Sequence, residues 1–199
     1  MKKLIISLLA LSLLVLLPGC MGIPLRSLPR LVKLPDQLLT LNPAEFMLAI
    51  QTDSRMLPPT GAVPTLDIAI RPKNVGDFAA VDKKIPMQLA VSNGISLGLD
   101  STPAGRRWLV YSFPLASQTE LAAIQTTFKR IKAENDAKGS KGGGSLSVGI
   151  AQQNVATADA ALDNTRWESW LQTSAKDGFF ELWSGTVKDI KAQAKKTEK

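Results

Sequence analysis

The chain has 199 residues, with 24 Lys and Arg against 17 Asp and Glu, a formal net charge of +7, one cysteine and no histidine. The absence of histidine removes the commonest general base near neutral pH, every histidine-dependent catalytic triad and every histidine metal site. The charge is moderate and falls short of the dense basic patches of nucleic-acid-binding proteins, so we expect no nucleic-acid partner.

The first 20 residues have the pattern of an export signal. Lys2 and Lys3 form a short basic start, and residues 4–17 are apolar apart from two serines. This run is shorter than the roughly 20 residues that a transmembrane helix needs. A basic start followed by a short apolar stretch is typical of a secretory signal peptide. We therefore expect residues 1–19 to be removed from the mature protein.

The leader ends in Leu17-Pro18-Gly19-Cys20, which resembles the lipobox of bacterial lipoproteins. The resemblance implies that Cys20 is acylated and becomes the first residue of the mature chain. Two or more acyl chains hold a protein stably at a membrane, whereas one chain binds reversibly. In this class a residue other than Asp after the cysteine implies the outer membrane, and here that residue is Met21. The resemblance thus implies a lipid-anchored protein of the bacterial cell envelope that faces the periplasm; the alternative is an uncleaved signal anchor with a buried cysteine.

Residues 20–44 follow the leader and contain four prolines. Each proline lacks a backbone donor and disfavours helix at the residue before it. We predict the lipidated Cys20 and then a tether, extended and partly packed on the domain through its leucines, with a reach of roughly 80 Å when fully extended. Its basic residues are expected near lipid headgroups, and the alternative is a solvated linker.

Residues 45–187 are predicted to form a single β-rich domain. Short apolar runs and period-two alternation predict strands over 46–50, 66–71, 85–92, 95–99, 106–115 and 146–151. Residues 106–115 are apolar on both faces, which favours a central position in a sheet. Residues 74–84 and 152–164 are expected to be loops. The fold class we predict is α+β, an antiparallel, sandwich-like domain with one amphipathic helix.

The predicted helix lies near residues 118–138. Ser117 and Glu120 have the spacing of a capping box, in which each side chain binds a free backbone N–H of the other. Four apolar residues at spacings of three and four form one stripe, namely Leu121, Ile124, Phe128 and Ile131. The basic side of this helix is expected to be solvated, with a lipid or acidic partner as the alternative.

Residues 166–187 are predicted to form an aromatic-rich hairpin. Asp177-Gly178 is a strong turn signal, and a three-residue loop pairs Leu171 with Trp183. A short helix over the first half is the competing interpretation. Tryptophans in such a hairpin are more often core than pocket residues, but the sequence leaves both readings open.

Residues 188–199 complete the chain. They are rich in lysine and nearly all polar. Because termini without apolar residues seldom pack on a domain, we predict a flexible basic tail.

The stretch Gly94 to Gly98 matches G-x-S-x-G, the nucleophile elbow of serine hydrolases. That motif needs a strand, a sharp turn and a helix, with the serine at the turn. Here we expect Ser96 inside a strand, after a loop over 92–94 with a left-handed Gly94, so that Met87 and Leu99 share one face. No histidine is present to activate Ser96.

These patterns predict no catalytic residue, no resident cofactor and no metal site. The leading hypothesis is a non-enzymatic envelope module that is anchored in the membrane and binds an envelope protein or a cell-wall polymer. The alternative is a lipoprotein that binds a small hydrophobic ligand or a lipid. An enzyme that uses carboxylates or lysine alone is a third hypothesis, for which no residue spacing argues.

The lipid anchor can be tested by metabolic labelling with radioactive palmitate. We expect the wild-type protein to incorporate the label and the Cys20→Ala variant to remain unlabelled, because this cysteine is the only thiol in the chain. Labelling that does not depend on Cys20, or no labelling at all, would contradict the anchor and the localisation inferred from it.

Overall fold

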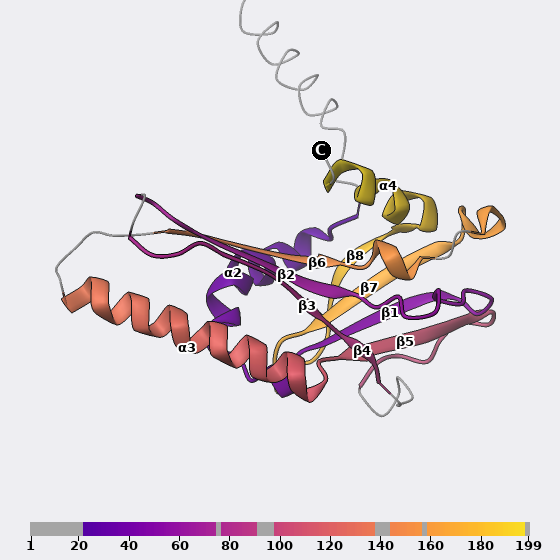
Figure 1. Ribbon diagram of the computed structural model, residues 1–199. Helices are drawn as coiled ribbons and strands as arrows, with labels where there is room; N and C mark the ends of the chain where they lie inside the picture. The colour runs from indigo at the N-terminus through magenta and orange to yellow at the C-terminus, as the bar shows by residue number, and fades with distance from the viewer. Residues whose placement is uncertain (1–21, 75–76, 91–97, 138–143, 157–158, 198–199) are drawn as a thin grey trace, which may run out of the picture.

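The computed structural model describes residues 22–74, 77–90, 98–137, 144–156 and 159–197. These residues form two antiparallel sheets with helices packed around them (Figure 1), so the predicted α+β, antiparallel β-rich class is confirmed. Beside the predicted helix, two further α-helices occur in this part of the chain. None of the helices described is long and apolar enough to cross a membrane.

The larger sheet has five strands in the order β4-β5-β1-β7-β8. Its strands are β1 (Met47–Asp53), β4 (Gln88–Leu89), β5 (Arg106–Ser112), β7 (Arg166–Gln172) and β8 (Phe180–Thr186). Five consecutive residues of β1 are buried, as expected for a strand with two neighbours and both faces covered. The predicted strand at 46–50 is therefore confirmed. The predicted strand at 106–115 corresponds to β5, which lies beside the central strand β1.

The smaller sheet has three strands in the order β3-β2-β6. They are β2 (Thr65–Pro72), β3 (Val81–Pro86) and β6 (Gly144–Ala151). The alternation predicted for β2 is confirmed, since Leu66, Ile68 and Ile70 are buried and the residues between them are more exposed. The loop predicted at 74–84 is partly wrong, because β3 begins at Val81. Backbone pairing with β2 holds this charged segment in a strand while its charges face solvent.

One continuous stretch links the two sheets. β3 ends at Pro86, Met87 is buried, and β4 then pairs with β5 in the other sheet. Strands that switch sheets in this way form the corners of packed sheets. The predicted hairpin over 85–99 is therefore replaced, in the part that is described, by a sheet-to-sheet crossover, and residues 91–97 lie outside the described residues.

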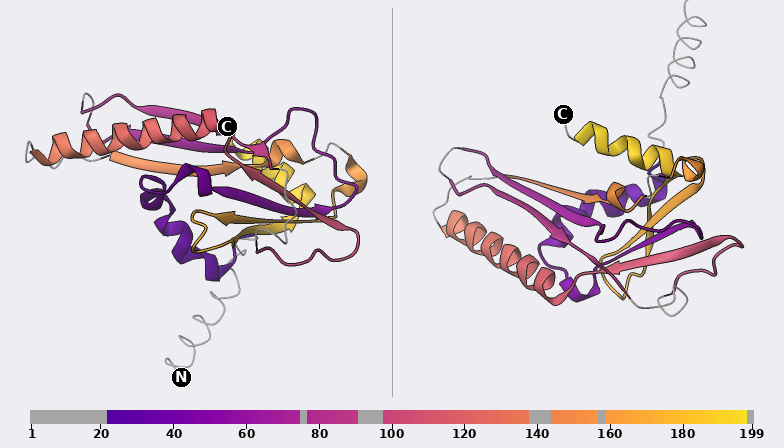
Figure 2. Two further views of the ribbon diagram at one scale, coloured as in Figure 1. Left: turned by 90° about the horizontal axis from the view of Figure 1, so that it is seen from below. Right: turned by 45° about the vertical axis from the view of Figure 1, so that its right-hand side comes forward.

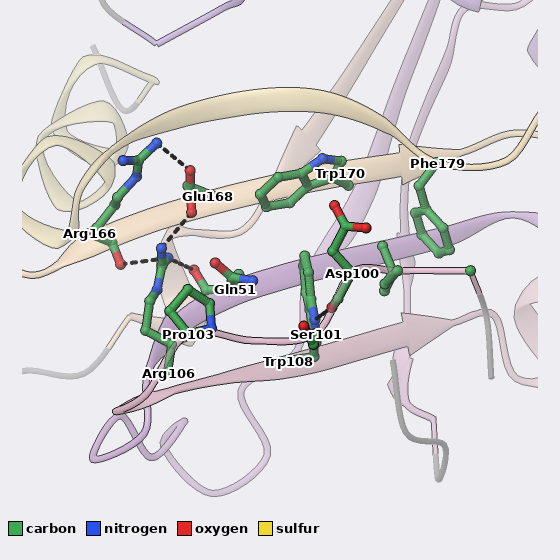
Figure 3. A pocket seen from close by; sticks show the side chains of 12 residues that line it. Gln51, Asp100, Ser101, Pro103, Arg106, Trp108, Arg166, Glu168, Trp170 and Phe179 are labelled. Atoms are coloured by element: carbon green, nitrogen blue, oxygen red, sulfur yellow. Dashed lines mark hydrogen bonds and ion pairs between the residues drawn. The ribbon is translucent and has the colours of Figure 1, made fainter. Parts of the chain in front are cut away.

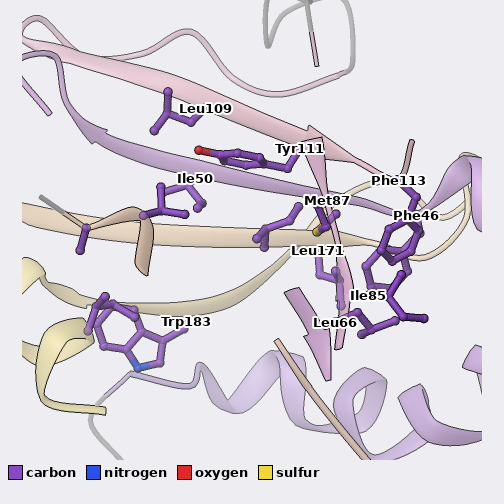
Figure 4. Packing of buried hydrophobic residues seen from close by; sticks show 14 of the residues in the cluster. Phe46, Ile50, Leu66, Ile85, Met87, Leu109, Tyr111, Phe113, Leu171 and Trp183 are labelled. Carbon is purple, nitrogen blue, oxygen red and sulfur yellow. The ribbon is translucent and has the colours of Figure 1, made fainter. Parts of the chain in front are cut away.

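The main core lies between the inner faces of the two sheets (Figure 4). Leu48, Ile50 and Tyr111 come from the large sheet and Leu66 and Ile85 from the small one. The remaining buried members include Leu34, Leu38, Phe46, Met87, Phe113, Leu121, Trp167, Leu171, Trp183, Val187 and Ile190. Burial raises the pKa of the Tyr111 hydroxyl to about 12, because the charged form loses its hydration.

The predicted helix is α3, which spans Leu115–Ala137. The apolar stripe points inward as expected, with Leu121 and Ile124 buried. The predicted capping box is wrong because the helix begins two residues before Ser117. The Ser117 hydroxyl instead donates to the Pro86 carbonyl over 2.7 Å, and Glu120 pairs with Lys83 over 2.9 Å. Both contacts fix the helix to the β3 crossover.

The extended tether predicted for residues 20–44 is wrong over most of its length. A 3-10 turn, η1 (Leu25–Ser27), leads into α2 (Leu28–Leu38). Pro29 lies in the first turn, where its missing N–H needs no partner. Leu34 and Leu38 are buried in the main core, and burial of this apolar face outweighs the cost of Pro35 inside the helix. The helices flank the small sheet at opposite edges, α3 beside β3 and α2 beside β6 (Figure 2).

The predicted flexible tail is also wrong, since α4 spans Val187–Thr197. Thr186 and Asp189 form a reciprocal cap: the Thr186 N–H donates to the Asp189 carboxylate over 2.9 Å, and the Asp189 N–H donates to the Thr186 hydroxyl oxygen over 3.2 Å. Hydrogen bonds from Thr186 lower the pKa of Asp189. Val187 and Ile190 are fully buried and Lys191 pairs with Asp163 over 2.6 Å, so apolar burial and an ion pair, together with the cap, hold this lysine-rich helix on the core.

The hairpin predicted at 166–187 is confirmed as β7 and β8, but its register is different. Ser169 lies opposite Trp183, where the prediction places Leu171. A β-bulge follows, because Trp170 pairs with Glu181 and leaves Leu182 as the extra residue. The bulge was not readable from turn residues alone.

Short 3-10 helices complete the described part. They are η2 (Pro43–Glu45), η4 (Gln153–Val155) and η5 (Ala160–Leu162). The last two lie in the predicted loop at 152–164, whose described residues form no strand or α-helix. Val155 and Leu162 from this loop are buried, so the loop closes one side of the core.

The role of α2 in the fold can be tested with two substitutions in that helix. Leu38→Ala removes a side chain that is 1% exposed, and we expect it to lower the free energy of unfolding by about 2–5 kcal/mol. Val32→Ala removes a side chain that is 77% exposed and is expected to change it by less than about 0.5 kcal/mol. Urea unfolding followed by tryptophan fluorescence measures both. Equal, small effects would restore the tether interpretation.

Candidate functional site

The predicted lipidation site, Cys20, lies outside the described residues, and the first described residue is Gly22. The Gly22 carbonyl accepts a hydrogen bond of 2.7 Å from the Ser184 N–H at the edge of β8. Gly22 has a φ of +130°, and a Cβ atom there would lie 1.8 Å from the Trp183 indole nitrogen. Only glycine fits at this position, so the chain is fixed to the fold two residues after Cys20.

The predicted non-catalytic Ser96 and the predicted turn at Gly94 both lie outside the described residues. The expectation that Met87 and Leu99 share one face is wrong. Met87 belongs to the main core, whereas Leu99 packs with Ala49 and Val110 in a second apolar cluster on the other face of the large sheet.

This outer face of the large sheet carries a cavity of about 430 Å³ (Figure 3). β1, β5 and β7 form its floor and the segment at 98–103 forms one wall. Strand alternation places every second residue of the three strands on this face. The lining includes the side chains of Gln51, Asp100, Arg106, Trp108, Arg166, Glu168, Trp170 and Phe179.

Two tryptophans form the apolar part of the cavity. The rings of Trp108 and Trp170 meet edge to face with their centroids 5.0 Å apart. The Trp108 indole N–H donates to the Asp100 carbonyl over 2.9 Å, so it also holds the wall segment in place. Phe179 lies beside them on the same side of the sheet, and Figure 3 shows the Asp100 carboxylate directed toward this aromatic group.

The Phe179 end of the cavity is fixed by Glu45. The Ala175 N–H in the hairpin turn donates to the Glu45 carboxylate over 2.8 Å, and the Gln172 amide donates to the Glu45 carbonyl over 3.0 Å. The bond from Ala175, with a further one from Asn42, lowers the pKa of Glu45. The β7–β8 turn is thereby tied to the segment that precedes β1.

A charged group occupies the other end of the cavity. Glu168 accepts from Arg106 over 2.6 Å and from Arg166 over 2.5 Å. The side chains of Glu168 and Arg106 are 9% and 17% exposed, whereas that of Arg166 is 65% exposed. Arg106 also donates to the Gln51 carbonyl over 2.8 Å, and its Nε–H is buried with no hydrogen-bond partner among the described residues. The group is therefore rigid at Arg106 and solvent-facing at Arg166.

Asp53 lies opposite Arg106 in the sheet but does not bind it. Its carboxylate is held by Arg55 at 2.8 Å, and that pairing holds the pKa of Asp53 well below its usual range. Arg106 therefore pairs with Glu168, which lies on β7, on the other side of β1.

A second hollow of about 310 Å³ adjoins the first and shares Trp170 and Phe179 with it. Its far wall is the start of the N-terminal helix. The Arg30 guanidinium lies 5.1 Å from the centre of the Phe180 ring, and Arg26 pairs with Glu181 over 2.6 Å. The two hollows share a wall at Trp170 and Phe179, and two arginines line each of them; together we call them the recess.

The recess combines aromatic rings with arginine and carboxylate side chains. Two carboxylates, from Asp100 and Glu168, line the first cavity. Both oxygens of Glu168 pair with arginines, one with Arg106 and one with Arg166, whereas Asp100 is exposed. Among the described residues, no three or more acidic or cysteine side chains gather as metal ligands.

Sequence reasoning did not find this site. A signal was present, because Arg106 and Trp108, like Glu168 and Trp170, are two residues apart and so share a strand face. What the sequence did not show is that β5 and β7 lie on either side of β1, which brings these two pairs together.

The unequal roles of the two arginines can be tested by replacing each with glutamine. Arg106→Gln leaves Glu168 without its buried partner, and breaking such a pair typically costs about 3–5 kcal/mol of stability. Arg166→Gln removes an exposed partner of the same carboxylate and is expected to cost less than about 1 kcal/mol. Urea unfolding gives both values. Similar losses of unfolding free energy in the two variants would show that the buried Arg106–Glu168 pair stabilises the fold no more than the exposed Arg166–Glu168 pair.

Comparisons with protein-family models, with curated proteins and with solved structures found no match to this chain. The candidate site therefore rests on its geometry and its chemistry.

Proposed function

We propose that this protein is a lipid-anchored component of the bacterial cell envelope, held by Cys20 in the outer membrane and facing the periplasm. Its domain is a non-enzymatic module that binds a cell-wall glycan. The leader of residues 1–19 and the lipobox-like ending at Cys20 support the location. The recess on the outer face of the large sheet supports the binding role.

The observation that carries the binding role is the mixture of groups in the 430 Å³ cavity. Sugar rings offer flat faces of C–H groups and many hydroxyls. The indoles of Trp108 and Trp170 provide apolar surface for such faces. The exposed side chains of Arg166 and Asp100 supply donors and acceptors for the hydroxyls.

Charge also favours a neutral, polar ligand. The lining contains two arginines, Arg106 and Arg166, and two acidic residues, Asp100 and Glu168, so its formal charges cancel. A strongly anionic or cationic ligand would gain little from such a site. The second hollow lies next to the first across Trp170 and Phe179, and two adjacent hollows suit a chain of several units better than a single small molecule.

The second candidate is a lipoprotein that binds a small hydrophobic ligand. A mostly apolar groove of about 240 Å³ under α3 favours it, between Ile70 and Val81 on one side and Ile124 and Phe128 on the other. This volume is below the roughly 300–1,000 Å³ of typical ligand pockets. We therefore rank the glycan-binding role first.

The proposal can be tested by sedimentation of the purified full-length protein with insoluble cell-wall sacculi. Ser101 is exposed in the cavity wall, and Ser101→Trp fills the opening without disturbing the core. We expect this variant to bind sacculi about tenfold more weakly, a loss of about 1.4 kcal/mol. Ser147→Trp, at an exposed position on β6 in the other sheet, is the matched control and should bind like the wild type.

Three results would contradict the proposal. Wild-type protein that stays in the supernatant would exclude a cell-wall ligand. Equal binding by Ser101→Trp would place the contact elsewhere on the domain. Release of soluble fragments from the sacculi would show an enzyme instead of a binding module.

A further inference from the structure

The described chain begins with an exposed apolar surface. Ile23, Leu25, Leu28 and Val32 are 42%, 83%, 41% and 77% exposed. They make up four of the seven large apolar side chains that are exposed in the described residues, and the other three are Leu57, Leu89 and Leu115. We call these four residues the N-terminal apolar surface. Single exposed apolar residues need no explanation, but such a concentration in ten residues does.

The same helix presents different residues to the core and to the outside. Leu34 and Leu38 are buried and Leu31 packs against the core cluster, so one face of α2 is already used. Leu28 and Val32 are one turn apart on another face, which is exposed. The exposed apolar surface is therefore not a by-product of packing on the domain.

Basic side chains accompany this surface. Arg26, Arg30 and Lys33 are exposed in the same stretch, against one exposed acidic residue, Asp36. Exposed apolar groups interspersed with arginine and lysine are typical of segments that lie in the interface of a membrane with anionic lipids.

The position of the surface identifies its occupant. Gly22 is fixed to β8 and Cys20 precedes it by two residues, which together span at most about 7 Å. An acyl-bearing Cys20 therefore brings the bilayer surface against η1 and α2. Figure 2 shows η1 and α2, in indigo, on the side of the molecule away from α3.

We infer that the N-terminal apolar surface lies in the headgroup region of an anionic bilayer, with Arg26, Arg30 and Lys33 among the lipid phosphates. The domain then rests directly on the membrane in one orientation instead of moving on a long tether. This inference rests on the lipid anchor of the proposed function and adds a second, non-covalent membrane contact to it.

The test uses the full-length protein, matured in cells and placed in vesicles of phosphatidylethanolamine and phosphatidylglycerol. A nitrobenzoxadiazole thiol label is attached to Val32→Cys, and to Leu115→Cys as the control. Leu115 is 78% exposed at the start of α3 and so matches Val32 in exposure. Leu25→Cys, at an 83% exposed position, is a second probe of the same surface.

We expect the labels at 25 and 32 to emit at shorter wavelength on vesicles and to be quenched about two-fold by doxyl-labelled lipid, as for groups at the headgroup boundary. The label at 115 should keep the emission that it has in water. Water-like emission at 25 and 32 on vesicle-bound protein would overturn the inference. Shielding of these labels before vesicles are added would also overturn it, since a second copy or another protein segment would then cover the surface.

Failure of the anchor is recognised separately. The wild-type protein has one cysteine, so it should take up no thiol label if Cys20 is acylated. If it does take up label, the anchor of the proposed function is wrong. The probes are then repeated with Cys20→Ser and added vesicles, and the same emission changes decide whether the surface binds the bilayer without a lipid.

Discussion

The structure depends most on the burial of β1 on both of its faces. Leu48 and Ile50 fill the space between the sheets, while Ala49 and Gln51 belong to the opposite face, where the candidate site lies. Ala49 has a small side chain, which leaves room above β1 for the indoles of Trp108 and Trp170 to meet from the neighbouring strands. A single strand thus supports the core on one side and the floor of the recess on the other.

The parts of the fold that sequence reasoning predicted are those set by local periodicity. Residues 66–71 alternate cleanly because one face of β2 is buried, and the stripe of α3 repeats at helical spacing. The failures came from rules applied to single residues. Prolines 29 and 35 suggested a tether, although Leu31, Leu34 and Leu38 have the spacing of a helix face. The flexible tail was predicted from the lysines of 188–199, although Thr186 and Asp189 have the spacing of a helix cap in the sequence.

The recess could not be predicted because it is a property of strand order. Arg106 lies on β5 and Glu168 on β7. They meet only because both strands pair with β1, one on each side of it. The register of the β7–β8 hairpin could not be predicted either, because it depends on a bulge. The bulge at Leu182 places Trp183 in the core, whereas regular alternation along β7 places Trp170 on the outer face, so the hairpin tryptophans serve both the core and the pocket.

The recess and the N-terminal apolar surface are joined through one short segment. Arg26 and Arg30 wall the second hollow and also stand among the exposed residues of η1 and α2. If the bilayer covers that surface, the second hollow, which these residues line, lies nearer to the membrane than the first. A ligand that enters from the cell-wall side would then meet Arg166 before Arg26 of η1 and Arg30 of α2.

The bond between Gly22 and Ser184 has a consequence for the order in which the fold assembles. It joins the first described residue to β8. The central strand β1 also cannot complete its pairing until β5 and β7 have been synthesised. Contacts between residues so far apart in sequence form slowly, because the intervening loop must close first. The segment at Gly22, just before the amino-terminal helix, therefore stays without this contact until nearly the whole chain has emerged. A polypeptide that leaves a ribosome or a translocation channel from its amino end must avoid non-native contacts of this leucine-rich segment until β8 is available to pair with it.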